Sequence, residues 1–233
     1  MTCLNIKGEK MPFKTFMNLS KKRQKEIIDT CLKEFALRDY NEVSLSKIIK
    51  KLGLAKGSFY RYFGSKRDLY EYLIEYAKEL NIGLYEKTLK DAGDDILDAW
   101  SRFYLQAAAL DNEYPVFGAF GYKVSQERDN VLLGNVALKS KIRGIEVLRK
   151  LFEEQQKKGN IRKDLGVDQM IYTLLQVQEG VMDYLAIKYK IDFKRNIEKG
   201  KPLFSIPADL LQKELEGFAR IIREGIGQKR STK

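Results

Sequence analysis

The stretch that decides the fold runs from Ser44 to Phe63 and reads SLSKIIKKLGLAKGSFYRYF. On both sides of Gly53 its apolar residues recur at steps of three and four, which is the pattern of two short amphipathic helices. Ser44 is a suitable N-cap for the first helix, and Gly53 can adopt the left-handed conformation that ends it. This order predicts a helix-turn-helix motif, although a plain helical hairpin inside a core would show the same pattern.

The same stretch lies in the most basic part of the chain. The sequence has 233 residues, 43 Lys and Arg, 32 Asp and Glu, and a formal net charge of +11. Residues 1–66 carry +9 of this charge, and the window Val43–Arg67 holds seven basic residues and no acid. Such a window indicates contact with a polyanion, whereas a solvated basic surface is the alternative interpretation.

If Phe59 and Phe63 are buried, the second helix exposes side chains that suit a DNA groove. Arg and Lys can pair with guanine, Ser with either type of base, and Tyr hydroxyls with phosphate. The residues expected to be exposed in this way are Lys56, Gly57, Ser58, Tyr60, Arg61 and Tyr62.

Residues 20–75 resemble the DNA-binding domain of the TetR family of bacterial transcription regulators. The motifs that carry the resemblance are Ile27-Ile28 through Phe35, Val43-Ser44-Leu45, the run from Gly53 to Phe63, and Ser65-Lys66-Arg67-Asp68-Leu69. The resemblance implies that Lys56, Gly57, Tyr60, Arg61 and Tyr62 touch bases or phosphates, that Lys66 binds a phosphate, and that Ser44 and Ser46 lie near the DNA backbone. Ile49 stands where such motifs usually have Ala, and Lys47 where an acid often sits, so the operator sequence stays open.

Outside this stretch, helical periodicity predicts an all-α chain. We expect a first helix from about residue 20 and further helices at 45–52, 56–63, 66–90, 95–111, 115–123, 126–158, 167–189 and 207–226, with a loop at 190–206. The predicted organisation is a basic N-terminal extension (1–18), a helix-turn-helix domain (19–65) and a helical regulatory and dimerisation domain (66–233). Residues 1–16 are either a basic arm or an extension upstream of a start at Met17.

Two helices near the end of the chain predict a protein partner. The 167–189 helix carries two apolar stripes, of which one can serve its own core and the other a second copy. The residues expected at this interface are Val177, Val181, Tyr184, Leu211, Leu215, Phe218 and Ile222. The resemblance likewise implies a homodimer on a palindromic operator, whereas a buried helix pair in a monomer is the alternative.

The segment 96–155 is rich in aromatic residues, and the resemblance implies a ligand pocket there. The residues expected to line it are Trp100, Phe103, Tyr104, Phe117, Phe120 and Tyr122, with Gln176 as a polar group. Aromatic walls suit a flat or apolar molecule. Ordinary core packing explains the same aromatic residues equally well.

The chain contains no histidine, which removes the commonest general base and metal ligand. We therefore expect no enzyme, metal or cofactor, although an enzyme that uses carboxylates in a helical core stays a third hypothesis. No apolar run approaches the length of a membrane span, so we expect no membrane partner. The two cysteines form no disulfide framework, which fits a cytoplasmic protein.

Together these observations predict a ligand-responsive DNA-binding regulator. It would be a repressor that binds double-stranded operator DNA as a homodimer and is released by an unknown small molecule. As the resemblance implies, the effector would shift the helix at 66–90, which connects the two domains. The alternative is an activator, or a DNA-binding regulator without a small-molecule ligand.

Overall fold

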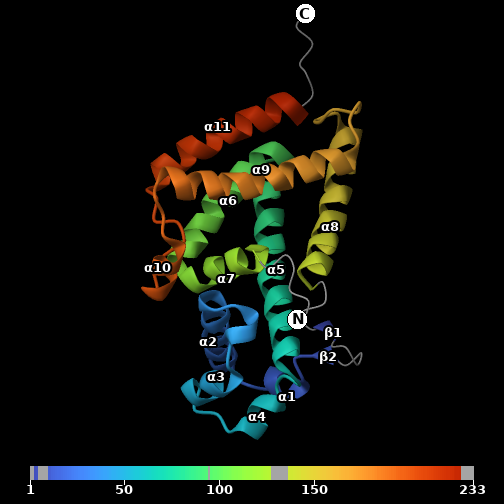
Figure 1. Ribbon diagram of the computed structural model, residues 1–233. Helices are drawn as coiled ribbons and strands as arrows, with labels where there is room; N and C mark the ends of the chain where they lie inside the picture. Colours follow the sequence, from blue (N-terminus) through green and yellow to red (C-terminus); the bar gives the residue numbers. More distant parts are fainter. Residues whose placement is uncertain (1–2, 5–9, 94, 127–135, 227–233) are drawn as a thin grey trace, which may run out of the picture. The chain divides into compact units, whose positions relative to one another are not determined.

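The computed structural model describes residues 3–4, 10–93, 95–126 and 136–226, and most of these are helical (Figure 1). The elements in chain order are β1 (Cys3–Leu4), β2 (Lys10–Met11), α1 (Lys14–Met17), α2 (Lys21–Leu37), η1 (Tyr40–Glu42), α3 (Leu45–Lys51), α4 (Lys56–Tyr60), α5 (Lys66–Asp91), α6 (Ile96–Glu113), α7 (Pro115–Gln126), α8 (Val136–Lys158), α9 (Val167–Lys188), α10 (Phe193–Glu198) and α11 (Ala208–Ile226). The short strands β1 and β2 pair antiparallel. The prediction of an all-α fold is confirmed, apart from this hairpin.

The chain divides into two units, and each is assembled from separate segments. Unit 1 consists of Met1–Leu80, Tyr114–Ser140 and Lys194–Leu203, and unit 2 of Asn81–Glu113, Lys141–Phe193 and Phe204–Lys233. The long helix α5 therefore contributes residues to both units. The domain boundary that the sequence predicts, between residues 65 and 66, coincides with the start of this helix and stays a prediction.

Unit 1 is built around α2, which contacts α3 and α7 (Figure 1). Ser20 caps α2 as predicted, because its hydroxyl accepts a hydrogen bond from the Arg23 backbone N–H at 3.3 Å. Phe120 of α7 is fully buried and meets Tyr70 of α5 edge-on, with ring centroids 5.7 Å apart. A segment from the predicted regulatory part of the chain thus packs against the first helix of the predicted DNA-binding domain.

Unit 2 has its own apolar core, in which α11 packs along α6 and beside α9 (Figure 1). Its most deeply buried members include Ile96, Ala99, Trp100, Phe152, Ile171, Val181 and Leu215. Because α6, α9 and α11 each contribute a continuous buried stripe to this core, its packing fixes the rotation of all three helices.

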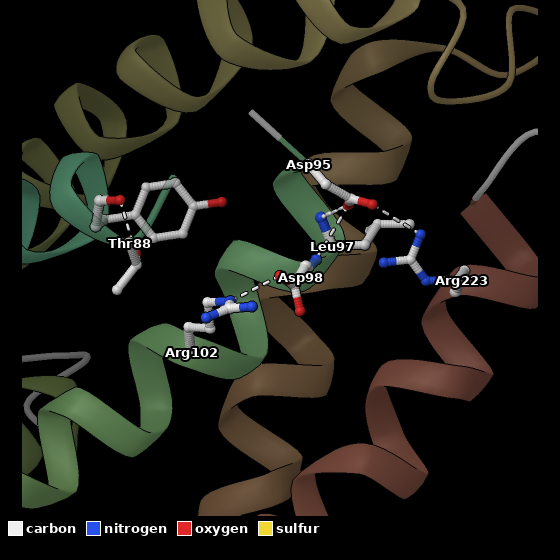
Figure 2. A network of polar contacts seen from close by, with 7 residues as sticks. Thr88, Asp95, Leu97, Asp98, Arg102 and Arg223 are labelled. Atoms are coloured by element: carbon white, nitrogen blue, oxygen red, sulfur yellow. Dashed lines mark hydrogen bonds and ion pairs between the residues drawn. The ribbon is translucent and has the colours of Figure 1, made fainter. Parts of the chain in front are cut away.

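A polar network at the start of α6 joins that helix to α11. Figure 2 shows the Asp95 carboxylate, which accepts hydrogen bonds from the backbone N–H groups of Leu97 at 2.9 Å and Asp98 at 3.1 Å. Arg223 of α11 pairs with the same carboxylate at 3.0 Å. Partial burial alone would raise the pKa of Asp95, but the hydrogen bonds from Arg223 and from the backbone lower it. Asp95 therefore caps α6 as an anion.

Two segments differ from the predicted helix pattern. Residues 1–18 are predicted to be irregular, but the described part contains the β1–β2 hairpin and α1, whose Phe16 is fully buried. Residues 190–206 are predicted to be a loop, but they contain α10. Both helices are too short to show a helical period in the sequence. The predicted start of the 126–158 helix falls partly on residues 127–135, which lie outside the described residues.

Candidate nucleic-acid interface

The helix-turn-helix forms where the sequence predicts it, within unit 1. Ser44 caps α3, since its hydroxyl accepts a hydrogen bond from the Lys47 backbone N–H at 3.4 Å. Gly53 follows α3 with φ of +61°, the left-handed conformation that the turn requires. Phe59 and Phe63 are fully buried and hold α4 and the turn after it on the core. The helix α4 itself ends three residues earlier than predicted.

The side of α4 that faces away from this core carries the predicted recognition residues. Of these, Lys56, Gly57, Tyr60 and Arg61 are exposed, and Ser58 and Tyr62 are half-buried. A Cβ placed on Gly57 would meet no atom within 4 Å, so packing within the chain does not require a glycine there. The Arg61 guanidinium donates to Ser58 Oγ at 3.2 Å and keeps its other N–H groups for an acceptor.

The acid-free window contributes exposed cations that have no carboxylate partner. Lys47 and Lys50 of α3 are exposed, as are Lys56 and Arg61 of α4 and the turn that follows. Among the described residues, none of these four is recorded in an ion pair. Arg67, by contrast, pairs with Glu71 at 2.8 Å within α5. The unneutralised charge therefore belongs to α3, α4 and the turn after it.

Other cations of the same region serve the fold. Glu34 of α2 is 1% exposed and accepts from Arg38 at 2.6 Å and from Lys51 of α3. Arg23 donates to the carbonyl of Leu52 at 2.7 Å, just after α3. A buried carboxylate requires such partners because its desolvation is unfavourable. Arg23, one of the lysine and arginine residues that open α2, thus holds the end of α3, and Lys51 holds α3 to α2.

Lys66, the first residue of α5, has partners within the chain. Its ammonium stands 4.6 Å from the centroid of the Tyr40 ring and donates to the Asn41 carbonyl at 3.3 Å. Burial lowers the pKa of Lys66. An ammonium has three donors, so it can also bind a phosphate from this position. Ser46 is exposed on α3, whereas the Ser44 hydroxyl is engaged as the cap.

A family model described as "Bacterial regulatory proteins, tetR family" matches residues 27–73, which include most of α2, all of α3 and α4, and the start of α5. The likeness to the tetR family is therefore shown for the helix-turn-helix part of the chain. An uncharacterized HTH-type transcriptional regulator, YuxN of Bacillus subtilis (strain 168), is 35% identical over 88 residues. That alignment covers 35% of this chain and 28% of the relative, so the shared part is well under half of either protein.

Solved structures share the fold over nearly the whole chain. A TetR family transcriptional regulator from Chloroflexus aurantiacus J-10-FL is 23% identical with a TM-score of 0.64, and the match covers 94% of this chain and 100% of that one. A gamma-butyrolactone receptor described as an ArpA-like protein is 21% identical with a TM-score of 0.54, covering 83% and 97%. At these identities the likeness shows the fold alone, which this chain shares with these structures beyond the helix-turn-helix.

The predicted ligand-pocket residues fall into both units. Phe117, Phe120 and Tyr122 lie on α7 in unit 1, whereas Trp100, Phe103, Tyr104 and Gln176 lie in unit 2. In unit 2 the rings form a chain of edge contacts: Trp100 meets Tyr104 at 4.9 Å, and Tyr104 meets Phe103 at 6.0 Å. Gln176 is exposed on α9 and does not join this aromatic group.

The aromatic group contains a residue that the sequence did not single out. Tyr85 of α5 meets Phe103 at 5.7 Å, edge-on. The Tyr85 hydroxyl and the Trp100 indole N–H are buried and have no hydrogen-bond partner among the described residues. Tyr104 differs, since its hydroxyl donates to the Gln178 carbonyl at 3.2 Å. Two buried donors without an acceptor among the described residues are unusual in a folded core and distinguish this aromatic group.

The predicted dimer residues are mostly buried in the chain's own core. Val181, Leu211, Leu215 and Ile222 are at most 5% exposed, and Val177 and Phe218 pack against the same cluster. Tyr184 is the exposed member, at 36%, and its ring meets Phe218 at 5.3 Å. The apolar residues that the sequence predicts for a partner on α9 and α11 are therefore largely residues that pack these helices into the core of unit 2.

A second apolar surface on the same two helices points away from the core. We call it the outer face, and it consists of Tyr172, Gly180 and Ile187 on α9 and Leu210, Gly217 and Ile221 on α11. Ile187 is 79% exposed and Ile221 67% exposed. A Cβ on Gly180 or Gly217 would meet no atom within 4 Å. These glycines leave open space in mid-helix, where glycine costs about 1 kcal/mol relative to alanine.

Cysteine and metal chemistry have no visible site in the described residues. Cys31 is fully buried on α2, and burial raises the pKa of its thiol, which stays protonated and enclosed. No group of His, Cys, Asp and Glu residues in the described ranges could hold a metal ion. None of the helices described there has the length and apolarity needed to cross a bilayer.

Proposed function

We propose that the chain is a transcription repressor that binds a palindromic operator as a homodimer and is released by a small molecule. The observation that carries the proposal is the exposed surface of α3 and α4, which holds Lys47, Lys50, Lys56 and Arg61 without a carboxylate partner among the described residues. Unneutralised cations bind DNA because they replace counterions at the phosphates. The work of the chain is then binding, without catalysis or a cofactor.

The geometry of α4 supports docking in the major groove. Lys56 and Arg61 stand at its two ends, where each can pair with guanine, while Tyr60 and Lys66 can reach phosphates. Phe59 and Phe63 anchor the opposite side, so α4 presents one fixed face. A helix of this kind reads three or four base pairs of a half-site.

The outer face supports the homodimer. It is apolar, exposed and interrupted by Gly180 and Gly217, so the helices of a second copy can approach closely. Covering exposed isoleucines such as Ile187 and Ile221 removes apolar surface from water, which is favourable. A two-fold dimer that binds a palindrome places its recognition helices about 34–36 Å apart, one turn of DNA.

The aromatic group of unit 2 supports a small-molecule effector. Tyr85 and Trp100 are buried donors without an acceptor among the described residues, and each unsatisfied group costs about 1–3 kcal/mol. A neutral, largely apolar molecule with hydrogen-bond acceptors would satisfy both donors and stack on the rings. Such an effector releases DNA only if it binds the DNA-incompetent state more tightly. The helix α5, which has residues in both units, is the element through which we expect the shift to pass.

Selection of duplexes from a random pool tests the proposal. The full chain should enrich an inverted repeat, and Lys56→Ala or Tyr60→Ala should weaken binding to the enriched duplex at fixed salt. A thermal-shift screen with neutral apolar compounds should then find a ligand that lowers DNA affinity. Failure to enrich any duplex would refute DNA binding, and a non-repeated site would refute the dimeric arrangement.

The alternative function makes different predictions in the same assays. An activator, or a regulator without a ligand, would also enrich a duplex. For a regulator without a ligand, no compound in the screen would release that DNA. For an activator, release of the protein from the DNA would end its promotion of transcription in a reconstituted assay. Reporter transcription with and without the protein separates a repressor from an activator directly.

A further inference from the structure

The residues just before the helix-turn-helix contact the end of the recognition helix. The Phe13 backbone N–H donates to the Tyr62 carbonyl at 3.0 Å, and the Thr15 hydroxyl donates to the Arg61 carbonyl. Arg61 and Tyr62 directly follow α4, so residues 13 and 15 hold the point at which this helix ends. Both residues lie outside the family match at residues 27–73.

The same segment is anchored by a buried ring. Phe16 of α1 is fully buried, and its ring lies 5.1 Å from that of Phe63 and 6.0 Å from those of Tyr62 and Tyr72. The packing therefore joins α1 to the turn after α4 and to α5. Full burial of this ring removes its apolar surface from water, which favours this placement of the segment.

A third contact ties the segment to α2. The Gln24 side-chain amide donates to the carbonyls of Met17 and Leu19, each at 2.9 Å, and Gln24 itself is 8% exposed. Residues 12–19, which we call the N-terminal brace, are thus fixed at one end to α4 and at the other to α2. The brace is a built part of unit 1.

We propose that the N-terminal brace positions the recognition helix for sequence-specific DNA contact. The inference rests on the proposed function. The helix α4 has five residues, too few to be stable alone, so its direction depends on what holds its ends. The two braced carbonyls belong to Arg61 and Tyr62, whose side chains are predicted to contact DNA. Thr15 is a positioning residue, since it acts on DNA only through Arg61.

The proposal separates specific from non-specific binding. Non-specific affinity depends on the number of cations near phosphates, which a small rotation of α4 leaves unchanged. Base-edge contacts depend on hydrogen-bond geometry and are lost when the helix tilts. Loss of the brace contact at Arg61 should therefore weaken binding to the operator and spare binding to other DNA.

The test compares Thr15→Val with Thr15→Ser in the full chain. Thr15 is exposed, and valine keeps its shape while removing the hydroxyl, whereas serine keeps the hydroxyl. The probes are the duplex that the wild-type chain enriches from a random pool and a scrambled duplex of the same composition, at one salt concentration. A net hydrogen bond corresponds to a factor of about five, so Thr15→Val should bind the enriched duplex about fivefold more weakly.

Three further readouts make the test decisive. Binding of Thr15→Val to the scrambled duplex should stay within about twofold of wild type, its salt dependence should be unchanged, and Thr15→Ser should restore full affinity. Equal binding of both variants to the enriched duplex would overturn the proposal. Equal loss on both duplexes, accompanied by a lower melting temperature, would also overturn it, since the brace would then be merely structural. If the wild-type chain enriches no duplex, DNA binding itself fails and the inference with it.

Discussion

The outer face of α9 and α11 yields a prediction that separates association from folding. Ile221→Ser removes a side chain that is 67% exposed in the single chain. Full burial of an isoleucine stabilises by about 1.5–3 kcal/mol, so covering its exposed part stabilises a dimer by about 1–2 kcal/mol per copy. Each residue occurs twice in a two-fold interface, so the loss is about 2–4 kcal/mol, or roughly 30-fold to several hundred-fold in the dissociation constant.

Sedimentation velocity over a concentration series measures this dissociation constant, and urea unfolding measures the stability of the chain. Ile221→Ser should weaken the dimer and change the free energy of unfolding of the monomer by less than about 0.5 kcal/mol, as at other exposed sites. Leu215→Ala is the contrasting variant on α11. Its side chain is 1% exposed, so it should lower the free energy of unfolding by about 2–5 kcal/mol. Glu216→Ser, at an exposed position on the side of α11 away from the outer face, should change neither quantity.

Two results would refute the reasoning. If Ile221→Ser dimerises as tightly as wild type, the outer face does not form the interface. If Ile221→Ser unfolds as easily as Leu215→Ala, the division of α11 into a core stripe and an outer face is wrong. The comparison therefore tests both the partner and the packing.

Three other predictions follow from single contacts. Tyr85→Phe removes a buried hydroxyl without a partner among the described residues and should keep or raise the melting temperature. Tyr104→Phe breaks a hydrogen bond and should lower the free energy of unfolding by about 1 kcal/mol. A lower melting temperature for Tyr85→Phe would contradict this reasoning. Gly180→Ala should stabilise the monomer by about 1 kcal/mol and weaken the dimer, and an equal or tighter dimer would argue against close helix approach. Hydrogen bonds from Lys188 and its neighbours lower the pKa of Glu214 from 4.5 to about 2. The stability that Glu214 contributes is then complete above about pH 4.5 and is lost as the pH falls toward about 2, so Glu214→Gln should flatten the acid side of a melting-temperature profile.

The helix-turn-helix could be predicted because its signals are local. The cap at Ser44, the turn at Gly53 and the anchors at Phe59 and Phe63 all lie within one stretch, and each has a known conformational preference. The net charge of this region does not predict which of its cations are exposed and which are paired within the chain. Lys51 is held by Glu34, which lies 17 positions earlier in the chain, and no local pattern connects the two.

The dimer surface could not be assigned from periodicity alone. A helical stripe gives the direction in which apolar side chains point, but it does not say whether the neighbour on that side is the same chain or another copy. On α11 Leu215 is 1% exposed within the unit 2 core, whereas Ile221 is 67% exposed. Similarly, the sequence does not distinguish the aromatic residues of α6 from those of α7, but Trp100 belongs to unit 2 and Phe120 to unit 1.

The connections between the units constrain how an effector could act. The helix α6 belongs to unit 2 and ends at Glu113, whereas α7 begins at Pro115 and belongs to unit 1. A single residue, Tyr114, separates them, and proline at the first position of α7 restricts its backbone. On the proposed function, a displacement of α6 by an effector would pass to α7 through this short connection. It would then pass to α2, along which α7 packs, and through Arg23 of α2, which holds the end of α3, to the helix-turn-helix. The helix α5 provides a parallel route, since one continuous helix contributes to both units.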